Sequence, residues 1–268
     1  MKKIIAMLLA LSLVLAFAGC ASEKPAETTA APETTAAPEV TEEVPDTSET
    51  GPAEAEGTVM THAEYVAADL ESAVCVETYV QDTQSWWNNQ ITVHAQSEDG
   101  AYFIYNMECS EENAAKLVPG AKIRVTGYKS EWSGEVEIVD ATFELLEGSY
   151  TAEPVDVTDL LGTDALIEHQ NEKVTFTGMT VEAANEAGDA FLYDWDNSGA
   201  AGTDSDLYFN ASVGGNTYTF VIEYYLCNET TEAYQTVTNL KVGDTIDMEG
   251  FLYWYNGSQP HITSVVVK

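Results

Sequence analysis

A twelve-residue pattern occurs twice in this chain at one constant offset, and it limits the fold more than any other feature. The segment Leu117-Val-Pro-Gly-Ala-Lys-Ile-Arg-Val-Thr-Gly-Tyr128 matches Leu240-Lys-Val-Gly-Asp-Thr-Ile-Asp-Met-Glu-Gly-Phe251 position by position. Beyond the pattern, the same offset places Gly134 on Gly257. Glycines and apolar residues that recur at fixed spacing indicate two copies of one supersecondary unit.

Each copy contains segments with the alternation or β-branched composition of strands. In the first copy these segments are 74–81, 91–95, 102–107, 122–128 and 136–143. In the second copy they are 173–181, 207–213, 217–226, 245–255 and 261–267. Short helices are predicted between the third and fourth strands, at 110–117 after the N-cap residue Ser110 and near 230–240. Further helical segments are predicted at 61–70 and 158–168.

Five strands with a helix between the third and the fourth are the pattern of an OB-fold barrel. The motif Leu-x-x-Gly-x-x-Ile-x-x-x-Gly, which leads into the fourth strand, resembles that superfamily as well, and the resemblance covers 61–147 and 158–268. We therefore predict a mainly β fold: two small five-stranded OB-like barrels in tandem, each with its short helix between strands three and four. The predicted domains are 58–150 and 151–268, after a disordered linker.

The N-terminus predicts export and a lipid anchor. Lys2 and Lys3 precede an apolar run that ends at Gly19-Cys20, which is typical of a secretory signal peptide. The run Phe17-Ala-Gly-Cys20 resembles a bacterial lipobox, although most lipoboxes have Leu where this chain has Phe17. The resemblance implies that residues 1–19 are removed and that Cys20 carries the lipid, holding the protein to the outer face of the cell membrane. The alternative is an ordinary secreted protein in which Cys20 is incidental.

Residues 20–57 are predicted to be a disordered linker. They are built from Thr, Ala, Pro and Glu and contain the direct repeat TTAAPETTAAPE but no aromatic residue. Such a segment cannot bury enough apolar surface to offset the entropy lost on ordering. The layout of signal, acidic linker and folded part resembles Gram-positive bacterial lipoproteins with tandem OB-fold-like domains. That likeness implies location and fold but no activity.

The strongly acidic composition of the chain limits its possible partners. The chain has a formal charge of −35, and residues 58–268 hold seven Lys or Arg against thirty-five Asp or Glu. Proteins that bind nucleic acid draw most of their affinity from cationic contacts to phosphate. The composition therefore predicts that nucleic acid is not a partner, and it leaves a membrane reached through Cys20, a glycan or another envelope protein.

All five tryptophans fall in or beside the two loops that flank the ligand face of an OB-fold. Aromatic rings near polar side chains suit stacking on sugars, with Asn88, Asn89, Gln90, Asn256 and Gln259 as hydrogen-bond partners. The alternative is that these rings close the barrel ends or the contact between barrels. The candidate ligand-binding residues are Trp86, Trp87, Tyr102, Trp132, Trp195, Trp254 and Tyr255.

An acidic loop predicts a calcium site. Alternating oxygen-bearing side chains before a glycine resemble the start of a calcium loop, although Ser205 stands where the bidentate Glu is expected. The alternative is a solvated loop in an acidic protein. The candidate ligands are Asp194, Asp196, Ser198, Asp204 and Asp206.

Catalytic motifs give little support for an enzyme, and no catalytic residue is assigned. Glu135 and Glu137 alternate with apolar residues, which predicts that they lie on the solvent face of a strand. The preferred hypothesis is a non-enzymatic binding module that needs no cofactor and takes a glycan or cell-wall fragment. The alternatives are an assembly protein that contacts another envelope protein and a metal-dependent hydrolase centred on Asp194 and Asp196.

Overall fold

The computed structural model describes residues 57–268, which belong to one compact unit. The predicted signal peptide, the lipidation site at Cys20 and the linker up to residue 56 lie outside the described residues. The described part is mainly β, as predicted. None of its helices has the length and apolar character needed to cross a membrane.

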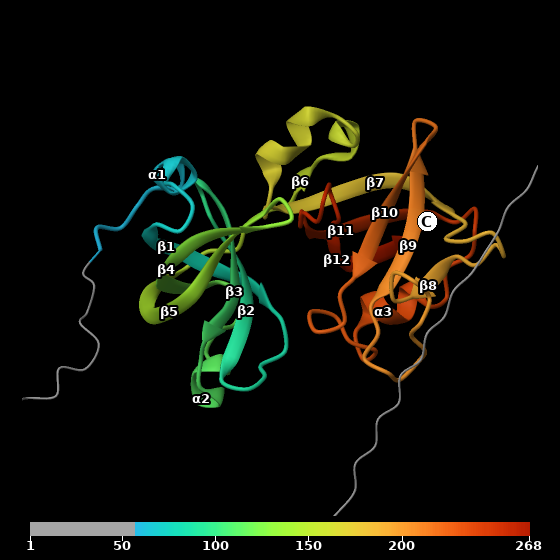
Figure 1. Cartoon of the computed structure of the whole chain (residues 1–268). Helices are drawn as coiled ribbons and strands as arrows, with labels where there is room; N and C mark the ends of the chain where they lie inside the picture. Colours follow the sequence, from blue (N-terminus) through green and yellow to red (C-terminus); the bar gives the residue numbers. More distant parts are fainter. Residues whose placement is uncertain (1–56) are drawn as a thin grey trace, which may run out of the picture. The chain divides into compact units, whose positions relative to one another are not determined.

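The first five strands close into a barrel in the order β1-β2-β3-β5-β4 (Figure 1). The pair β3 and β5 is parallel, while the other neighbours in the barrel are antiparallel. This arrangement is the five-stranded barrel expected from the sequence. The strands are β1 (Ala73–Thr83), β2 (Gln90–Ser97), β3 (Gly100–Glu108), β4 (Ala121–Trp132) and β5 (Glu135–Ser149).

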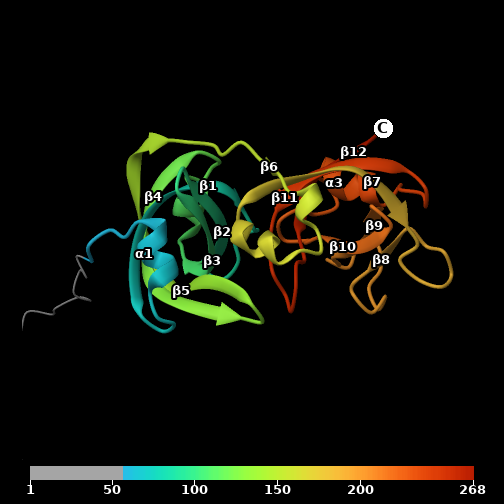
Figure 2. The same cartoon turned by 90° about the horizontal axis from the view of Figure 1, so that it is seen from above.

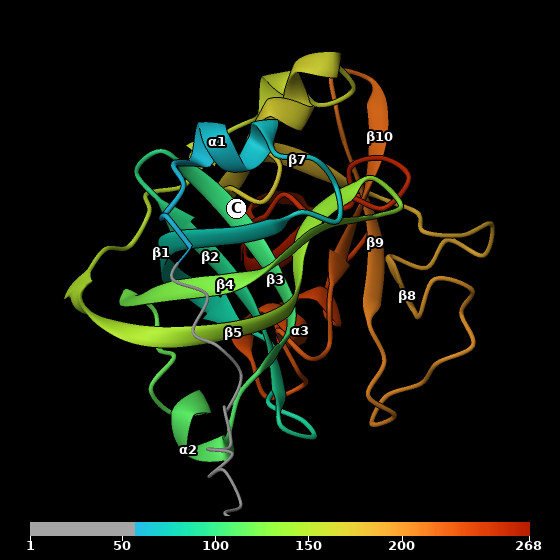
Figure 3. The same cartoon turned by 60° about the vertical axis from the view of Figure 1, so that its left-hand side comes forward.

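Two short helices lie at opposite ends of the first barrel (Figures 1 and 3). Helix α1 (His62–Ala67) begins with a capping box, in which Thr61 and Glu64 satisfy each other's backbone N–H groups. Helix α2 (Glu111–Ala114) is capped by the Ser110 side chain and lies between β3 and β4, as predicted.

The second sheet has the order β6-β7-β11-β12-β10-β9-β8, and a further pairing between β7 and β9 closes five of its strands into a ring. In this ring β10 and β12 are parallel, as β3 and β5 are in the first barrel. The connectivity is therefore the same in both barrels. The strands are β6 (Val155–Asp156), β7 (Lys173–Glu182), β8 (Phe191–Tyr193), β9 (Leu207–Val213), β10 (Asn216–Ile222), β11 (Thr245–Phe251) and β12 (His261–Val267).

The segments between these strands differ from the first copy. Helix α3 (Glu232–Val237) lies between β10 and β11, as predicted, with the Thr231 side chain as its N-cap. The predicted helix at 158–168 is instead two 3₁₀ helices, η1 (Thr158–Leu160) and η2 (Asp164–His169). Gly162 lies between them at φ +77°, outside the helical region, so one continuous helix cannot form. The connections on either side of β8 project away from the sheet (Figures 2 and 3).

The repeated glycines occupy equivalent positions where the chain has no room for a side chain. A Cβ at Gly127 would lie 2.7 Å from the Val139 carbonyl oxygen, and a Cβ at Gly250 would overlap the His261 carbonyl. Both glycines face a register shift in the neighbouring strand. Gly120 and Gly243 instead have φ near +91° and +95° in the turn before the fourth strand. The repeated glycines are thus explained by two structural needs: Gly127 and Gly250 allow close approach of two strands, and Gly120 and Gly243 allow the turn geometry.

Each barrel encloses its own hydrophobic core. The repeated apolar positions Leu117, Ile123, Leu240 and Ile246 are all buried in these cores. The cysteines of the described part are buried and free: Cys75, Cys109 and Cys227. The functional surface must therefore be sought on the outer faces of the strands.

Candidate ligand-binding groove

The outer face of β2 and β3 packs against the second barrel. His94 of β2 stacks on Phe251 with ring centroids 4.3 Å apart, and Phe103 of β3 meets Tyr253 edge-on at 5.3 Å. Tyr253 also stacks on His261 at 4.2 Å. The sequence places the ligand face of an OB-like barrel here, but in the first barrel much of it is covered by the second barrel.

Polar contacts tie the two barrels together at several points. The Gln96 side-chain oxygen accepts the Lys173 backbone N–H at 2.8 Å. The Asn256 backbone N–H donates to the Ser133 carbonyl at 2.7 Å. These bonds join the β2 and β4–β5 regions of the first barrel to β7 and the β11–β12 turn of the second, so side chains on both barrels can build one site.

A groove with a volume of about 590 Å³ opens beside this contact and is lined from both barrels. Aromatic rings dominate its walls, and two carboxylates and two amides add polar groups. This composition is typical of a small-ligand site, in which rings supply contact area and a few polar groups fix orientation. The lining residues are Gln84, Phe103, Tyr105, Trp132, Trp195, Asp206, Tyr208, Val221, Glu223, Tyr253, Tyr255, Gln259 and His261.

The strand registers explain why these side chains share one wall. Tyr208 pairs with Val221, and Val221 pairs with His261, so one row crosses β9, β10 and β12. Residues directly opposite one another on paired strands point to the same face. Phe103 and Tyr105 are two residues apart on β3 and also share a face, opposite to the core residue Ile104.

Three predicted ligand-binding residues line the groove with their rings exposed. Trp132 is 61% exposed at the end of β4, Trp195 is 75% exposed on the loop after β8, and Tyr255 is 46% exposed in the β11–β12 turn. Large aromatic side chains usually bury most of their surface in a fold. The chain therefore leaves three large rings accessible at one opening.

Two half-buried carboxylates lie among the groove's aromatic rings. The Glu223 carboxylate accepts the backbone N–H groups of Tyr225 at 3.1 Å and Leu226 at 2.8 Å. The Asp206 Oδ1 atom accepts the Tyr224 N–H at 2.8 Å. Burial raises the pKa of Glu223 to about 7, and the neighbouring charge of Asp206 adds to the rise. Burial likewise raises the pKa of Asp206.

Four other predicted residues lie outside the groove. Trp86 packs on the first core, and its ring N–H donates to the Cys109 carbonyl at 2.8 Å. Trp254 packs on the second core. Tyr102 is 1% exposed and points into the first core, which corrects its assignment as an exposed ligand platform. Trp87 is 73% exposed but does not line the groove.

The acidic loop uses its own carboxylates to hold its shape. Asp194 accepts the Asp206 backbone N–H at 3.1 Å and the Ser205 hydroxyl at 3.2 Å, and Asp196 accepts the Ser198 N–H at 3.0 Å. Asp204 is exposed on the same loop. Within residues 57–268, no group of three or more His, Cys, Asp or Glu side chains could hold a metal ion. The geometry gives the calcium site and the metal-dependent hydrolase no support.

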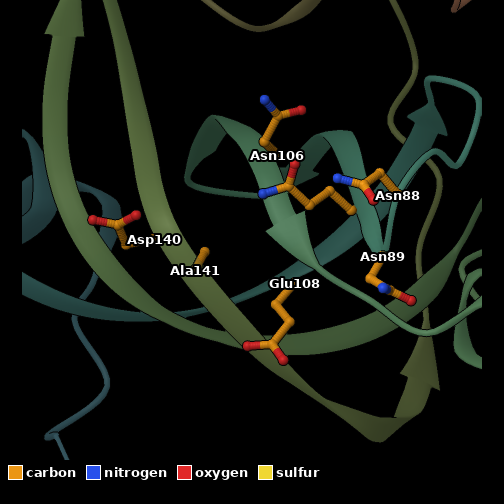
Figure 4. A pocket seen from close by; sticks show the side chains of 7 residues that line it. Asn88, Asn89, Asn106, Glu108, Asp140 and Ala141 are labelled. Atoms are coloured by element: carbon orange, nitrogen blue, oxygen red, sulfur yellow. The ribbon is translucent and has the colours of Figure 1, made fainter. Parts of the chain in front are cut away.

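Of the five predicted polar partners, Asn256 lines neither pocket, and the other four separate into two places. Gln259 lines the groove, whereas Asn88, Asn89 and Gln90 line a second, smaller pocket of about 380 Å³ on the first barrel (Figure 4). Amide and carboxylate side chains surround this second pocket, and no ring lines it. The remaining lining residues are Asn106, Glu108, Asp140 and Ala141.

Several groove residues have no recognisable sequence signal, and two acids lie elsewhere than predicted. Three of these residues lie at strand ends of the second barrel: Tyr208, Glu223 and His261. Their alternation with buried residues predicts an outer face of the barrel, but it does not predict that the first barrel lies beside that face. Glu135 and Glu137 were predicted to face solvent, yet they are 0% and 7% exposed. The start of β5 is covered because Trp254 and Gln170 of the second barrel contact Glu135, which no local pattern reveals.

Comparison with known proteins identifies no family. No protein-family model matches the chain, and no curated protein matches its sequence. Among solved structures, the p204 HINb domain has a TM-score of 0.35 and 10% identity, over 75% of this chain and 99% of that chain. The p202 HIN1 domain in complex with a 12-mer double-stranded DNA has a TM-score of 0.33 and 13% identity, over 75% and 94%. A murine DNA-binding protein bound to double-stranded DNA has a TM-score of 0.34 and 11% identity, over 72% and 94%.

These matches correct the charge-based prediction that nucleic acid is not a partner. Two of the matched structures are described as complexes with double-stranded DNA. Net charge alone does not exclude such a ligand. With TM-scores of 0.33 to 0.35, the likeness carries no argument for what this chain itself binds.

Proposed function

We propose that residues 57–268 form a non-enzymatic binding module whose aromatic groove takes a glycan. One observation carries the proposal: Trp132, Trp195 and Tyr255 expose their rings at a groove that also presents polar side chains. Flat rings stack on the apolar faces of sugars, while amides and carboxylates bind sugar hydroxyls. The sequence-based prediction of a lipid on Cys20 would place this module at the outer face of the cell membrane.

Several side chains of the groove are already held in fixed positions by their neighbours, which favours ligand binding. Tyr253 is held between Phe103 and His261, and the Glu223 carboxylate is fixed by two backbone N–H groups. Binding to groups that are already ordered loses less conformational entropy than binding to mobile ones. Trp195 lies on a loop that Asp194 ties to Asp206, so its position is also constrained.

The test compares tryptophans of equal exposure inside and outside the groove. Trp195→Ala and Trp132→Ala remove rings that line it, whereas Trp87→Ala removes a ring of similar exposure that does not. The mature protein is titrated calorimetrically with β-linked and cell-wall-derived oligosaccharides. We expect the two groove variants to lose at least tenfold in affinity, about 1.4 kcal/mol each, while Trp87→Ala binds like the wild type.

The same titration includes single- and double-stranded oligonucleotides at physiological salt, because charge alone does not decide that question. A protein that binds oligonucleotides but no oligosaccharide would overturn the proposal. Equal loss of affinity in all three tryptophan variants would also contradict it, since the groove would then have no special role.

A further inference from the structure

The charges that line the groove all have one sign. Asp206 and Glu223 line it, and its lining residues include no Lys or Arg. The ion pairs of the described residues lie elsewhere and involve neither carboxylate. Burial together with mutual repulsion raises the pKa of Glu223 to about 7, which is the expected response of an acid that lacks a counter-ion.

The two carboxylates are held in place by a single turn. Asp206 accepts the N–H of Tyr224, and Glu223 accepts the N–H groups of Tyr225 and Leu226, so three consecutive backbone donors hold both acids. These bonds keep the carboxylates together within the groove instead of letting them swing into solvent. The fold thus maintains a concentrated negative site that water only partly reaches.

A further buried polar group faces the same groove. His261 lines it, is 6% exposed, and its Nδ1 atom has no hydrogen-bond partner within residues 57–268. Burial lowers the pKa of His261 to about 3, so the ring is neutral at physiological pH. Buried polar atoms are normally hydrogen-bonded, and an unpaired one at a groove indicates a place for a ligand group.

We propose that the groove's ligand carries a positively charged amine, which is seated against Asp206 and Glu223 among the aromatic rings. The inference rests on the proposed glycan function and specifies its class: an oligosaccharide that carries free amino groups. An ammonium group supplies the missing counter-charge and is attracted to ring faces such as those of Tyr208 and Trp195. A neutral sugar leaves two partly desolvated carboxylates unpaired, which costs affinity.

The experiment uses three oligosaccharides with the same linkage and different nitrogen chemistry. The mature protein is titrated at pH 7, close to the pKa of Glu223, with β-1,4-linked tetramers of glucosamine, N-acetylglucosamine and glucose. We expect the glucosamine tetramer to bind at least tenfold more tightly than the N-acetylated one. Asp206→Asn removes the charge but keeps the Oδ1 acceptor for Tyr224, so the variant is expected to fold and to lose this preference.

A matched control separates the site from the general negative charge of the protein. Asp156 accepts the Thr158 N–H at 3.0 Å and does not line the groove, so Asp156→Asn makes the same change of charge elsewhere. We expect it to keep the preference for the glucosamine tetramer. Thermal unfolding of each variant verifies that it is folded before its affinity is compared.

Each outcome decides one of the two proposals. If both amino-sugar tetramers bind equally and Trp195→Ala weakens both, the charge inference is overturned and the glycan function stands. If glucosamine binding survives both Asp206→Asn and Trp195→Ala, it is nonspecific attraction to an acidic protein and the inference is overturned. If no tetramer binds, the inference fails, and the wider panel described above decides the glycan function separately.

Discussion

The carboxylate of Glu135 accepts the backbone N–H of Trp254 at 2.8 Å, across the contact between the two barrels. Its second oxygen, Oε1, is buried and has no hydrogen-bond partner within residues 57–268, and neither has the Oδ1 atom of Asn171. Two buried acceptors without a donor are costly, whereas a protonated carboxyl supplies one O–H. The unpaired Oε1 atom favours the neutral acid, and burial raises the pKa of Glu135 to about 8 against the opposing effect of the hydrogen bonds from Trp254 and Gln170.

This pKa predicts that the folded state weakens as the pH rises. Between pH 4.5 and about 8 the folded protein keeps a proton on Glu135 that the unfolded chain releases. The free energy of unfolding must then fall through this window, by at most about 1.4 kcal/mol per pH unit. Glu135→Gln does not titrate, keeps an acceptor for Trp254 and adds an N–H donor. We expect a flatter pH dependence and greater stability than the wild type at pH 8–9, measured by urea unfolding.

The control for this prediction is Glu131→Gln, which changes an exposed acid on the adjacent strand β4. It should leave the slope between pH 5 and 8 unchanged. Glu223, whose pKa is raised to about 7, contributes to the same slope and remains in both variants. A Glu135→Gln protein with the full wild-type slope would show that Glu135 is ionised in the folded state.

The histidines at the same contact predict the opposite trend in acid. His94 and His261 are buried, and burial holds the pKa of His94 well below its usual range and lowers that of His261 to about 3. The unfolded chain takes up protons near pH 6.5 while these rings stay neutral, so stability falls as the pH drops from about 6.5 toward 3. His94→Phe preserves an aromatic ring on Phe251 and should flatten this acid limb. His62→Gln, away from the contact, should not; an unchanged acid limb in His94→Phe would contradict the prediction.

Lipidation at Cys20 is a prediction of the sequence that can be tested in a bacterial host. Cells that express the full chain are labelled with a fatty acid and fractionated. We expect label and protein in the membrane fraction, and loss of both with Cys20→Ser. Cys75→Ser changes a buried core cysteine and should leave the labelling intact. A Cys20→Ser protein that still carries the fatty acid would contradict the lipobox interpretation.

Much of each barrel could be predicted because its signals are local. Alternation along β3 separates Tyr102 and Ile104 from Phe103, and the glycine pattern marks where two strands touch. Alternation does not say which of the two faces is inside, and the assignment of Tyr102 to ligand binding was therefore wrong. The faces between the barrels could not be predicted, since they depend on residues that are far apart in the chain, such as Gln96 and Lys173. Glu135 alternates with apolar neighbours as a solvent-facing acid would, yet Trp254 covers it.

The candidate groove was partly predictable for the same reason. Trp132 ends β4, while Trp195 and Tyr255 lie on loops, and aromatic residues in or beside the loops of an OB-like barrel are reasonable ligand contacts. Periodicity in the sequence does not distinguish an aromatic ring that lines a groove from one that packs against a barrel core. Trp86 is a ring of the second kind. Nothing in the sequence marks Asp206 and Glu223 as site residues, because the chain contains many other acids. Only the fold shows that these two line the same groove.

The repeated glycines provide the most direct test of why the sequence repeats. At Gly250 an added methyl group would overlap the backbone carbonyl of His261, and backbone atoms cannot move aside without breaking the β11–β12 pairing. Gly250→Ala should therefore lower the free energy of unfolding by more than about 3 kcal/mol. At Gly243 a methyl group would meet open space, so Gly243→Ala pays only for an unfavourable φ near +95°, about 1–2 kcal/mol.

Chemical denaturation of the two alanine variants and of Gly127→Ala measures this difference. Gly127 is the equivalent of Gly250 in the first barrel, where the added methyl group would approach the Val139 carbonyl at 2.7 Å. We expect both variants in the fourth strands to be destabilised more than Gly243→Ala. If Gly250→Ala cost no more than Gly243→Ala, close strand approach would not be the reason for the glycine. The repeat at that position would then have to be explained by turn geometry or by shared ancestry of the two barrels.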